Sequence, residues 1–187
     1  MRLARYERAG EARLAMVAGE DILDILDALD DLSDAPANAY KWFSDMTALI
    51  EAGPAAEEIL QKVAKTDAAR APLGEVRLLT PVHPGIILCS GENYWDHREE
   101  KPEVIAEEPE FFIKIPATGV IGPGDDILWD LAVTQKLDYE TELAVVIGKA
   151  GRHIPEAKAA EHIFGYTIMN DVTARDRQVK MRPDGSC

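Results

Sequence analysis

The hydrophobic residues of this chain are spaced differently in its first and second halves. Residues 2–7 and 12–19 have the short apolar runs that are typical of strands. Over 38–53, four large apolar residues fall on one face of a predicted helix. A second helix is predicted over 54–65, where a proline in the first turn does no harm. The residues on the shared helical face are Trp42, Met46, Leu49 and Ile50.

From residue 86 onward the pattern is mostly that of β-structure, with short apolar runs separated by proline and glycine turns. One helix is predicted over 154–163, and the punctuated segment 73–85 is interpreted as a connector. We therefore expect an α+β, β-rich protein with a small N-terminal α+β domain over 1–72 and a second domain over 86–187. The strands predicted for the second domain are 85–90, 111–115, 119–122, 138–148 and 164–170.

Three carboxylates alternate at the start of the strand predicted over 138–148. Asp138, Glu140 and Glu142 share one face, because residues two apart in a strand point the same way. From Leu143 to Ile147 both faces are apolar, which predicts a strand that is covered on both sides. Like charges at the edge of a core repel one another and lose solvation. Two interpretations stay open from this segment alone, a solvent-exposed strand face or a bound cation.

Composition narrows the choice of partner. The chain has 34 acidic and 20 basic residues, a net charge of −14 and no basic run. Nucleic acid and anionic membrane surfaces are therefore not expected as partners, whereas a divalent cation or a small molecule is. Cys89 and Cys187 lack the spacing of a zinc site or a disulfide framework, and no apolar run is long enough to span a membrane. These features predict a cytoplasmic protein.

Two further groups of residues have a functional and a structural interpretation. If the chain is helical from Asp171, then Asp171, Arg175 and Gln178 lie on one helical face. Alternatively, Asp171 is a helix N-cap and Arg175 is its solvated partner. His97 and Glu100 are three residues apart, close enough on a short helix for the carboxylate to orient the imidazole. A His–Glu pair at this spacing is also common on surfaces.

Taken together and in order, four segments closely resemble the fumarylacetoacetate hydrolase superfamily. The resemblance covers roughly residues 86 to 180, and its most specific part is the combination of E-x-E with a later D-x-x-x-R-x-x-Q. It implies a mixed β-sandwich or β-roll catalytic fold, incomplete at its C-terminus, behind a small α+β domain. The four segments are GENYWDHREE, FFIKIPATGVIGPGD, LDYETELAVVIGK and GYTIMNDVTARDRQ.

The resemblance implies a metal centre. Its divalent cation, Mg²⁺ or else Mn²⁺ or Ca²⁺, would be bound by Glu140, Glu142 and Asp171. This set consists of hard oxygen ligands, which suit these cations better than zinc. Asp138 would lie at the rim or in the surroundings of the ligands.

The resemblance also implies a catalytic dyad and substrate contacts. His97 and Glu100 match a dyad carried on a lid, in which His97 takes a proton from water. Arg175 and Gln178 match residues that contact the substrate, and Lys114 matches a lysine near the pocket. The implied partner is a small 2-oxo acid.

The activity implied by the resemblance is that of a divalent-metal-dependent hydrolase. Such an enzyme cleaves a carbon–carbon bond in 2-oxo acids or 1,3-dicarbonyl compounds of the acylpyruvate or fumarylacetoacetate type, and it is a homodimer when complete. Members of the same family are also decarboxylases, isomerases or dehydratases of 2-oxo acids. Because the chain ends a few residues after Gln178, before a downstream lysine and a loop used by the family, we expect a fragment. A catalytically inactive metal-binding module is the remaining alternative.

Overall fold

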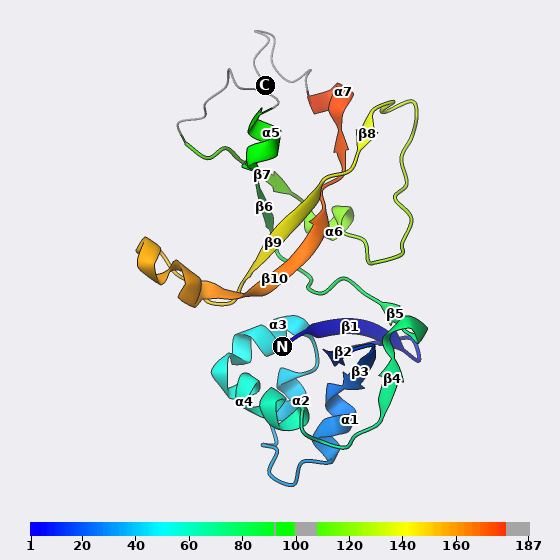
Figure 1. The fold of residues 1–187 in the computed structure, drawn as a ribbon, viewed down its shortest axis with the longest axis vertical. Helices are drawn as coiled ribbons and strands as arrows, with labels where there is room; N and C mark the ends of the chain where they lie inside the picture. Colours follow the sequence, from blue (N-terminus) through cyan, green and yellow to red (C-terminus); the bar gives the residue numbers. More distant parts are fainter. Residues whose placement is uncertain (92, 100–107, 179–187) are drawn as a thin grey trace.

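A computed structural model describes residues 1–91, 93–99 and 108–178, and Figure 1 shows how their helices and strands are arranged. The N-terminal part contains a five-stranded antiparallel sheet in the order β4-β3-β2-β1-β5. Its first hairpin turns through Ala9 and Gly10, both with positive φ, as a two-residue hairpin favours. The strands are β1 (Leu3–Arg8), β2 (Glu11–Ala18), β3 (Asp21–Asp24), β4 (Arg70–Pro72) and β5 (Arg77–Leu78).

Helices form one core with this sheet. Leu14 and Leu23 of the strands pack with Leu29, Phe43 and Val63, and each of these five side chains is at most 1% exposed. Burial of these apolar side chains is the main source of stability for the N-terminal part. The helices are α1 (Ile25–Asp30), α2 (Ala39–Trp42), α3 (Met46–Ala52) and α4 (Pro54–Val63).

The single helix predicted over 38–53 is two helices. Asp45 starts the second of them, because its carboxylate accepts a hydrogen bond from the Ala48 N–H at 3.0 Å. Gly53 ends α3 with a φ of 59°, a conformation that favours glycine, and Pro54 begins α4. The four apolar residues of the predicted face nevertheless all pack against the one core. The break between the two helices therefore changes the direction of the chain, but the apolar residues of the predicted face still pack into the core.

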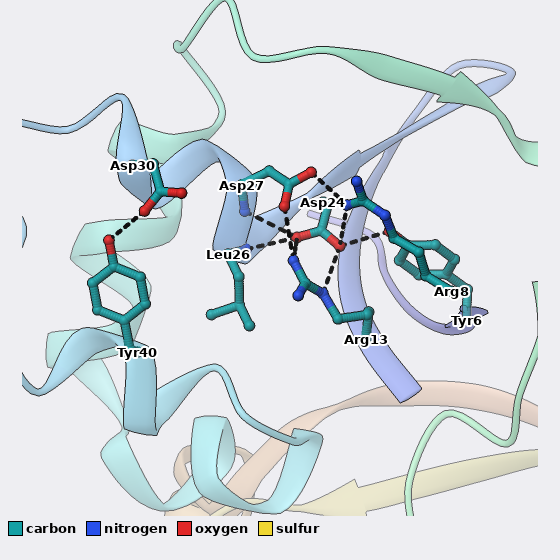
Figure 2. A network of polar contacts seen from close by, with 8 residues as sticks. All are labelled: Tyr6, Arg8, Arg13, Asp24, Leu26, Asp27, Asp30 and Tyr40. Carbon is teal, nitrogen blue, oxygen red and sulfur yellow. Dashed lines mark hydrogen bonds and ion pairs between the residues drawn. The ribbon is translucent and has the colours of Figure 1, made fainter. Parts of the chain in front are cut away.

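A polar cluster around Asp24 joins this sheet to α1 (Figure 2). The Asp24 carboxylate is 5% exposed, caps α1 through the N–H groups of Leu26 and Asp27, and accepts two hydrogen bonds from Arg13 at 2.9 and 2.7 Å. The Tyr6 hydroxyl donates a further bond at 2.6 Å. Burial acts to raise the pKa of Asp24, but the hydrogen bonds from Arg13 and Tyr6 outweigh it and hold that pKa below its usual value.

Removing this carboxylate is expected to destabilise the N-terminal part. We predict that Asp24→Ala lowers the free energy of unfolding by about 3 kcal/mol, because it removes a buried carboxylate that accepts from Arg13, Tyr6 and the start of α1 and leaves Arg13 paired only with the exposed Asp27. The pKa of Asp24 is lowered on folding. Its ionised carboxylate therefore contributes fully to the free energy of unfolding at neutral pH, and this contribution is lost as the pH falls below about 4. Denaturant unfolding followed by circular dichroism at several pH values measures both effects.

Asp45→Ala is the matched control for this prediction, because Asp45 also caps a helix but is exposed. It should cost only about 1 kcal/mol. Equal losses for the two variants would mean that the contacts of Asp24 with Arg13 and Tyr6 contribute nothing beyond the helix cap.

The second part of the chain lies above the five-stranded sheet in Figure 1, and its described residues form three two-stranded antiparallel ladders. The ladders pair β6 (Ile87–Ser90) with β7 (Phe111–Lys114), β8 (Leu137–Asp138) with β11 (Thr173–Ala174), and β9 (Thr141–Ile147) with β10 (Ile163–Asn170). The short helices described in this part are α5 (Trp95–Glu99), α6 (Pro116–Gly119), η2 (Glu156–His162) and α7 (Arg175–Gln178), while η1 (Leu73–Glu75) joins β4 to β5 in the N-terminal part. The predicted α+β, β-rich class is confirmed. None of the helices described is both long and apolar enough to cross a membrane.

Two predicted elements differ from the structure. No strand forms over 119–122, because Pro116 starts the short helix α6, which ends at Gly119. The chain then turns where the Asp125 carboxylate accepts a hydrogen bond from the Gly122 N–H at 2.9 Å. The helix predicted over 154–163 is the 3₁₀ helix η2.

The ladder of β9 and β10 contains a β-bulge. Ile147 lies opposite Ile163, but the next pair is Val146 with Gly165, so Phe164 is an extra residue in β10. Gly148 makes room for it: a Cβ atom at this position would lie 2.8 Å from the Cβ of Phe164. The register from Gly165 to Asn170 is therefore shifted by one residue relative to Ile163.

One face of this ladder is apolar and uncovered among the described residues. Leu143 and Ile168 lie directly opposite each other and are 61% and 75% exposed. The prediction of a strand covered on both sides is therefore wrong for the described part of the chain, where only the Glu142 face is half-buried. We call the exposed face the apolar ladder face; its residues are Leu143, Val145, Ile147, Phe164, Tyr166 and Ile168.

Candidate metal centre

The end of the β9–β10 ladder brings three carboxylates together. Glu142 lies opposite Met169, and the pairing continues past the last rung, where the Asp171 N–H donates a hydrogen bond to the Glu140 carbonyl oxygen at 2.8 Å. Glu140 and Glu142 are two residues apart, and Asp171 is opposite Glu140. All three side chains therefore point to the same face of the ladder.

These carboxylates form a compact cluster. One oxygen from each of Glu140, Glu142 and Asp171 lies within 4.8 Å of the other two. Asp171 is 1% exposed, and neither of its Oδ atoms has a hydrogen-bond partner of normal geometry among the described residues. Three carboxylates at this separation repel one another, and oxygen donors are the ligands that Mg²⁺, Mn²⁺ and Ca²⁺ prefer. The donor set therefore fits a divalent cation.

Lys114 brings a positive charge to the buried end of the cluster. Its ammonium group forms an ion pair with Asp171 Oδ1 and donates a hydrogen bond to the Val172 carbonyl oxygen at 3.0 Å. Lys114 pairs with Ile87 across β6 and β7, so Cys89 lies on the same face of that ladder. Burial, together with the Asp171 carboxylate, raises the pKa of the Cys89 thiol to about 11. The Cys89 thiol is therefore protonated at neutral pH in the metal-free site.

Arg175 brings a second positive charge, at the more open end. The backbone N–H of Arg175 donates to the Lys136 carbonyl oxygen at 2.9 Å, and its side-chain Nε donates to the Asp138 carboxylate at 2.8 Å. The guanidinium group also pairs with Glu140 and donates to Gln178 Oε1 at 3.1 Å. The hydrogen bond from Arg175 holds the pKa of Asp138 below its usual value. Asp138 thus orients Arg175 and lies outside the three-carboxylate cluster.

The helix that carries Arg175 is fastened to the long connection before β8. Asp176 accepts hydrogen bonds from the Thr134 hydroxyl at 2.5 Å and from the Gln135 N–H at 3.2 Å. Arg177 donates to the Val133 carbonyl oxygen at 2.6 Å. Sequence reasoning did not identify these contacts, because single polar residues in a loop follow no pattern. Thr134 is only 4% exposed, so this fastening is itself partly buried.

The segment of the predicted dyad is tied to the same ladder. The Leu143 N–H donates a hydrogen bond to the hydroxyl of Tyr94, the residue directly before α5, at 2.9 Å. Leu143 follows Glu142 in β9, so α5 begins close to the carboxylates. The side chain of His97 and the whole of Glu100 lie outside the described residues. Their pairing therefore stays a prediction.

The structure changes the interpretation of Asp171. The helix begins at Arg175, because Thr173–Ala174 pair with β8 and form β11 instead. Both sequence-based alternatives, a helical face starting at Asp171 and an N-cap role for it, are wrong. Asp171 and Arg175 nevertheless lie at one site. Asp171 is one of the three clustered carboxylates and pairs with Lys114, and Arg175 pairs with Glu140, another of the three.

Comparison with known proteins identifies the family. Residues 86–186 match the family model of the fumarylacetoacetate (FAA) hydrolase C-terminal domain. The chain belongs to the FAA hydrolase family. The resemblance inferred from the sequence is thereby confirmed, and the match covers every residue of the cluster described above.

Two relatives and one solved structure place this FAA hydrolase family member among enzymes. The oxaloacetate tautomerase YisK of Bacillus subtilis is 49% identical over 110 residues, which cover 57% of this chain and 36% of YisK. The human mitochondrial oxaloacetate tautomerase FAHD2A is 38% identical over 136 residues, which cover 72% of this chain and 43% of the relative. Maleylpyruvate hydrolase from Sphingobium sp. SYK-6, solved with manganese(II) and pyruvate, is 30% identical with a TM-score of 0.71, over 94% of this chain and 60% of that one. The chain spans about half the length of the curated relatives that it matches.

Proposed function

We propose that this protein belongs to a divalent-metal-dependent enzyme that converts a small 2-oxo acid through its enol form. The observation that carries the proposal is the convergence of Glu140, Glu142 and Asp171, whose oxygens lie within 4.8 Å of one another. These residues would hold Mg²⁺, Mn²⁺ or Ca²⁺. When bound, the cation supplies a Lewis acid that disperses negative charge developing on the substrate oxygens.

The two cationic side chains next to the carboxylates favour an anionic substrate. Arg175 presents a planar guanidinium group, which matches a carboxylate in a two-pronged hydrogen bond, and Lys114 presents a point charge. Gln178 accepts from Arg175 at 3.1 Å and has amide N–H groups to donate to a substrate oxygen. In this proposal Lys114, Arg175 and Gln178 bind and orient the 2-oxo acid. His97, paired with Glu100, transfers the proton of the substrate.

Tautomerisation is the first candidate reaction, supported by the two oxaloacetate tautomerases among the relatives. In this reaction a base removes a proton from the carbon beside the oxo group and a proton is added to the oxo oxygen, with no bond between heavy atoms broken. A single positioned base and a group that stabilises the developing charge are sufficient. His97 is the proposed base.

Hydrolysis of a carbon–carbon bond is the second candidate, supported by the likeness to maleylpyruvate hydrolase. Here His97 takes a proton from water, and the hydroxide adds to a remote carbonyl carbon. The carbon–carbon bond then breaks, its electron pair stays on the 2-oxo acid fragment, and a proton from the dyad completes that fragment. This reaction needs an activated water and an acyl substrate, which tautomerisation does not.

A pair of assays tests the proposal, with the protein taken together with any sequence that follows residue 187 in its gene. Mg²⁺-dependent decay of enol-oxaloacetate absorbance is expected for tautomerisation, and metal-dependent release of pyruvate from an acylpyruvate is expected for hydrolysis. His97→Ala should lower turnover by about 100-fold and leave Mn²⁺ affinity unchanged, because a base on α5 is not a ligand. His153→Ala, in an exposed loop, is the control and should change neither quantity. Absence of metal-dependent turnover of both substrates would refute the proposed function.

A further inference from the structure

The most buried carboxylate of the metal centre already has a cation beside it. Asp171 is 1% exposed, and its Oδ1 forms an ion pair with the ammonium group of Lys114, whose side chain is 31% exposed. Of the ion pairs between described residues, only this one involves Asp171, and the Cys89 thiol, which also interacts with Asp171, is neutral. Lys114 is therefore what compensates the charge of this carboxylate when no metal is present, because an uncompensated buried charge is strongly destabilising.

A metal ion and this ammonium group would use the same carboxylate. Asp171 is one of the three residues whose oxygens gather within 4.8 Å, so a cation held by all three lies close to its Oδ atoms. Two cations on one buried carboxylate repel each other, and the repulsion is strong where water is excluded. The Val172 carbonyl oxygen, 3.0 Å from the Lys114 ammonium group, offers that group a second partner nearby.

We infer that Lys114 is the internal counter-ion of the metal centre and that it competes with the divalent cation for Asp171. This inference rests on the proposed metal site and adds a residue that sets its affinity. Metal binding displaces the ammonium group from Asp171, and the hydrogen bond to Val172 keeps it at the edge of the centre. There it is available to the carboxylate of an anionic substrate.

Calorimetric titration with Mn²⁺ tests the competition without any enzyme assay. Lys114→Met removes the competing charge and keeps a side chain of similar length, and we expect it to bind Mn²⁺ about 10-fold more tightly than the wild type. Lys114→Arg keeps the charge and should stay within a few-fold of the wild type. Mn²⁺ should also raise the melting temperature of Lys114→Met more than that of the wild type, because the tighter site stabilises more.

The methionine variant leaves Asp171 without a counter-ion in the metal-free state, so it is purified with Mn²⁺ and its affinity is measured by competition with a chelator as well. Equal or weaker binding than the wild type would overturn the inference and show instead that Lys114 positions Asp171 for the metal. A wild type that binds no Mn²⁺ would overturn both this inference and the proposed metal centre. The two failures are thus distinguishable.

Discussion

Replacing Asp171 with asparagine is expected to weaken Mn²⁺ binding by more than about 100-fold. Loss of a residue that only surrounds the ligands typically costs about 10- to 100-fold in metal affinity, and Asp171 is proposed as a ligand itself. Asparagine has nearly the same shape, so packing at this buried position is retained while the charge is lost. Calorimetry with Mn²⁺ on the wild type and the variant measures the effect directly.

Asp138→Asn provides the control for this measurement. Asp138 is a carboxylate close to the same centre, but its partner is Arg175 and it lies outside the three-carboxylate cluster. Its replacement should change Mn²⁺ affinity by no more than about 10-fold. If Asp171→Asn binds Mn²⁺ as well as Asp138→Asn does, Asp171 is not a ligand and the proposed centre must be placed elsewhere.

The 187-residue chain on its own is expected to self-associate through the apolar ladder face. Leu143 and Ile168 are 61% and 75% exposed and lie directly opposite each other, at one end of the apolar ladder face. Exposed apolar faces of this kind recruit other chains. In size-exclusion chromatography at tens of micromolar protein, the wild type should elute as a dimer or larger species.

Ile168→Glu should shift that elution toward the monomer, because a charge on the apolar ladder face must lose its solvation when two copies meet there. Leu128→Glu makes the same chemical change at a residue that is 90% exposed but belongs to no strand, and it should leave the elution volume unchanged. A monomeric wild type, or an equal shift for both variants, would rule out association through this face.

The sequence was most informative where a short-range pattern and the fold impose the same constraint. Alternation of acids at Glu140 and Glu142 predicts a shared face whatever lies opposite, and the structure has that face. The motif combination added Asp171, which no local pattern places beside them. The helical face of the N-terminal part was likewise predicted, because Met46 and Leu49 need only the helical period to point the same way.

The errors and omissions have one physical cause, which is that tertiary contacts decide local structure. The segment 119–122 has strand-like composition but follows a proline-started helix. Thr173–Ala174 pair with a strand more than thirty residues earlier, and this pairing delays the helix to Arg175. The contact of Lys114 with Asp171 joins residues from separate ladders. Which residue pairs with Lys114 depends on how those ladders pack, and the spacing of residues along the chain does not predict that packing.

The bulge at Phe164 determines on which side of the ladder Asp171 emerges. With the bulge, Glu140 is opposite Asp171; if Phe164 were paired in regular register instead, the pairing would slip by one and Asp171 would be opposite Tyr139, on the other face. Insertions or deletions in the connection from 149 to 162 can therefore leave the carboxylates in place only while the bulge is kept. Deletion of the Phe164 codon, by contrast, would remove the bulge and leave Gly165 opposite Val146 and Asp171 opposite Glu140, so at this position β10 can lose one residue without loss of the cluster.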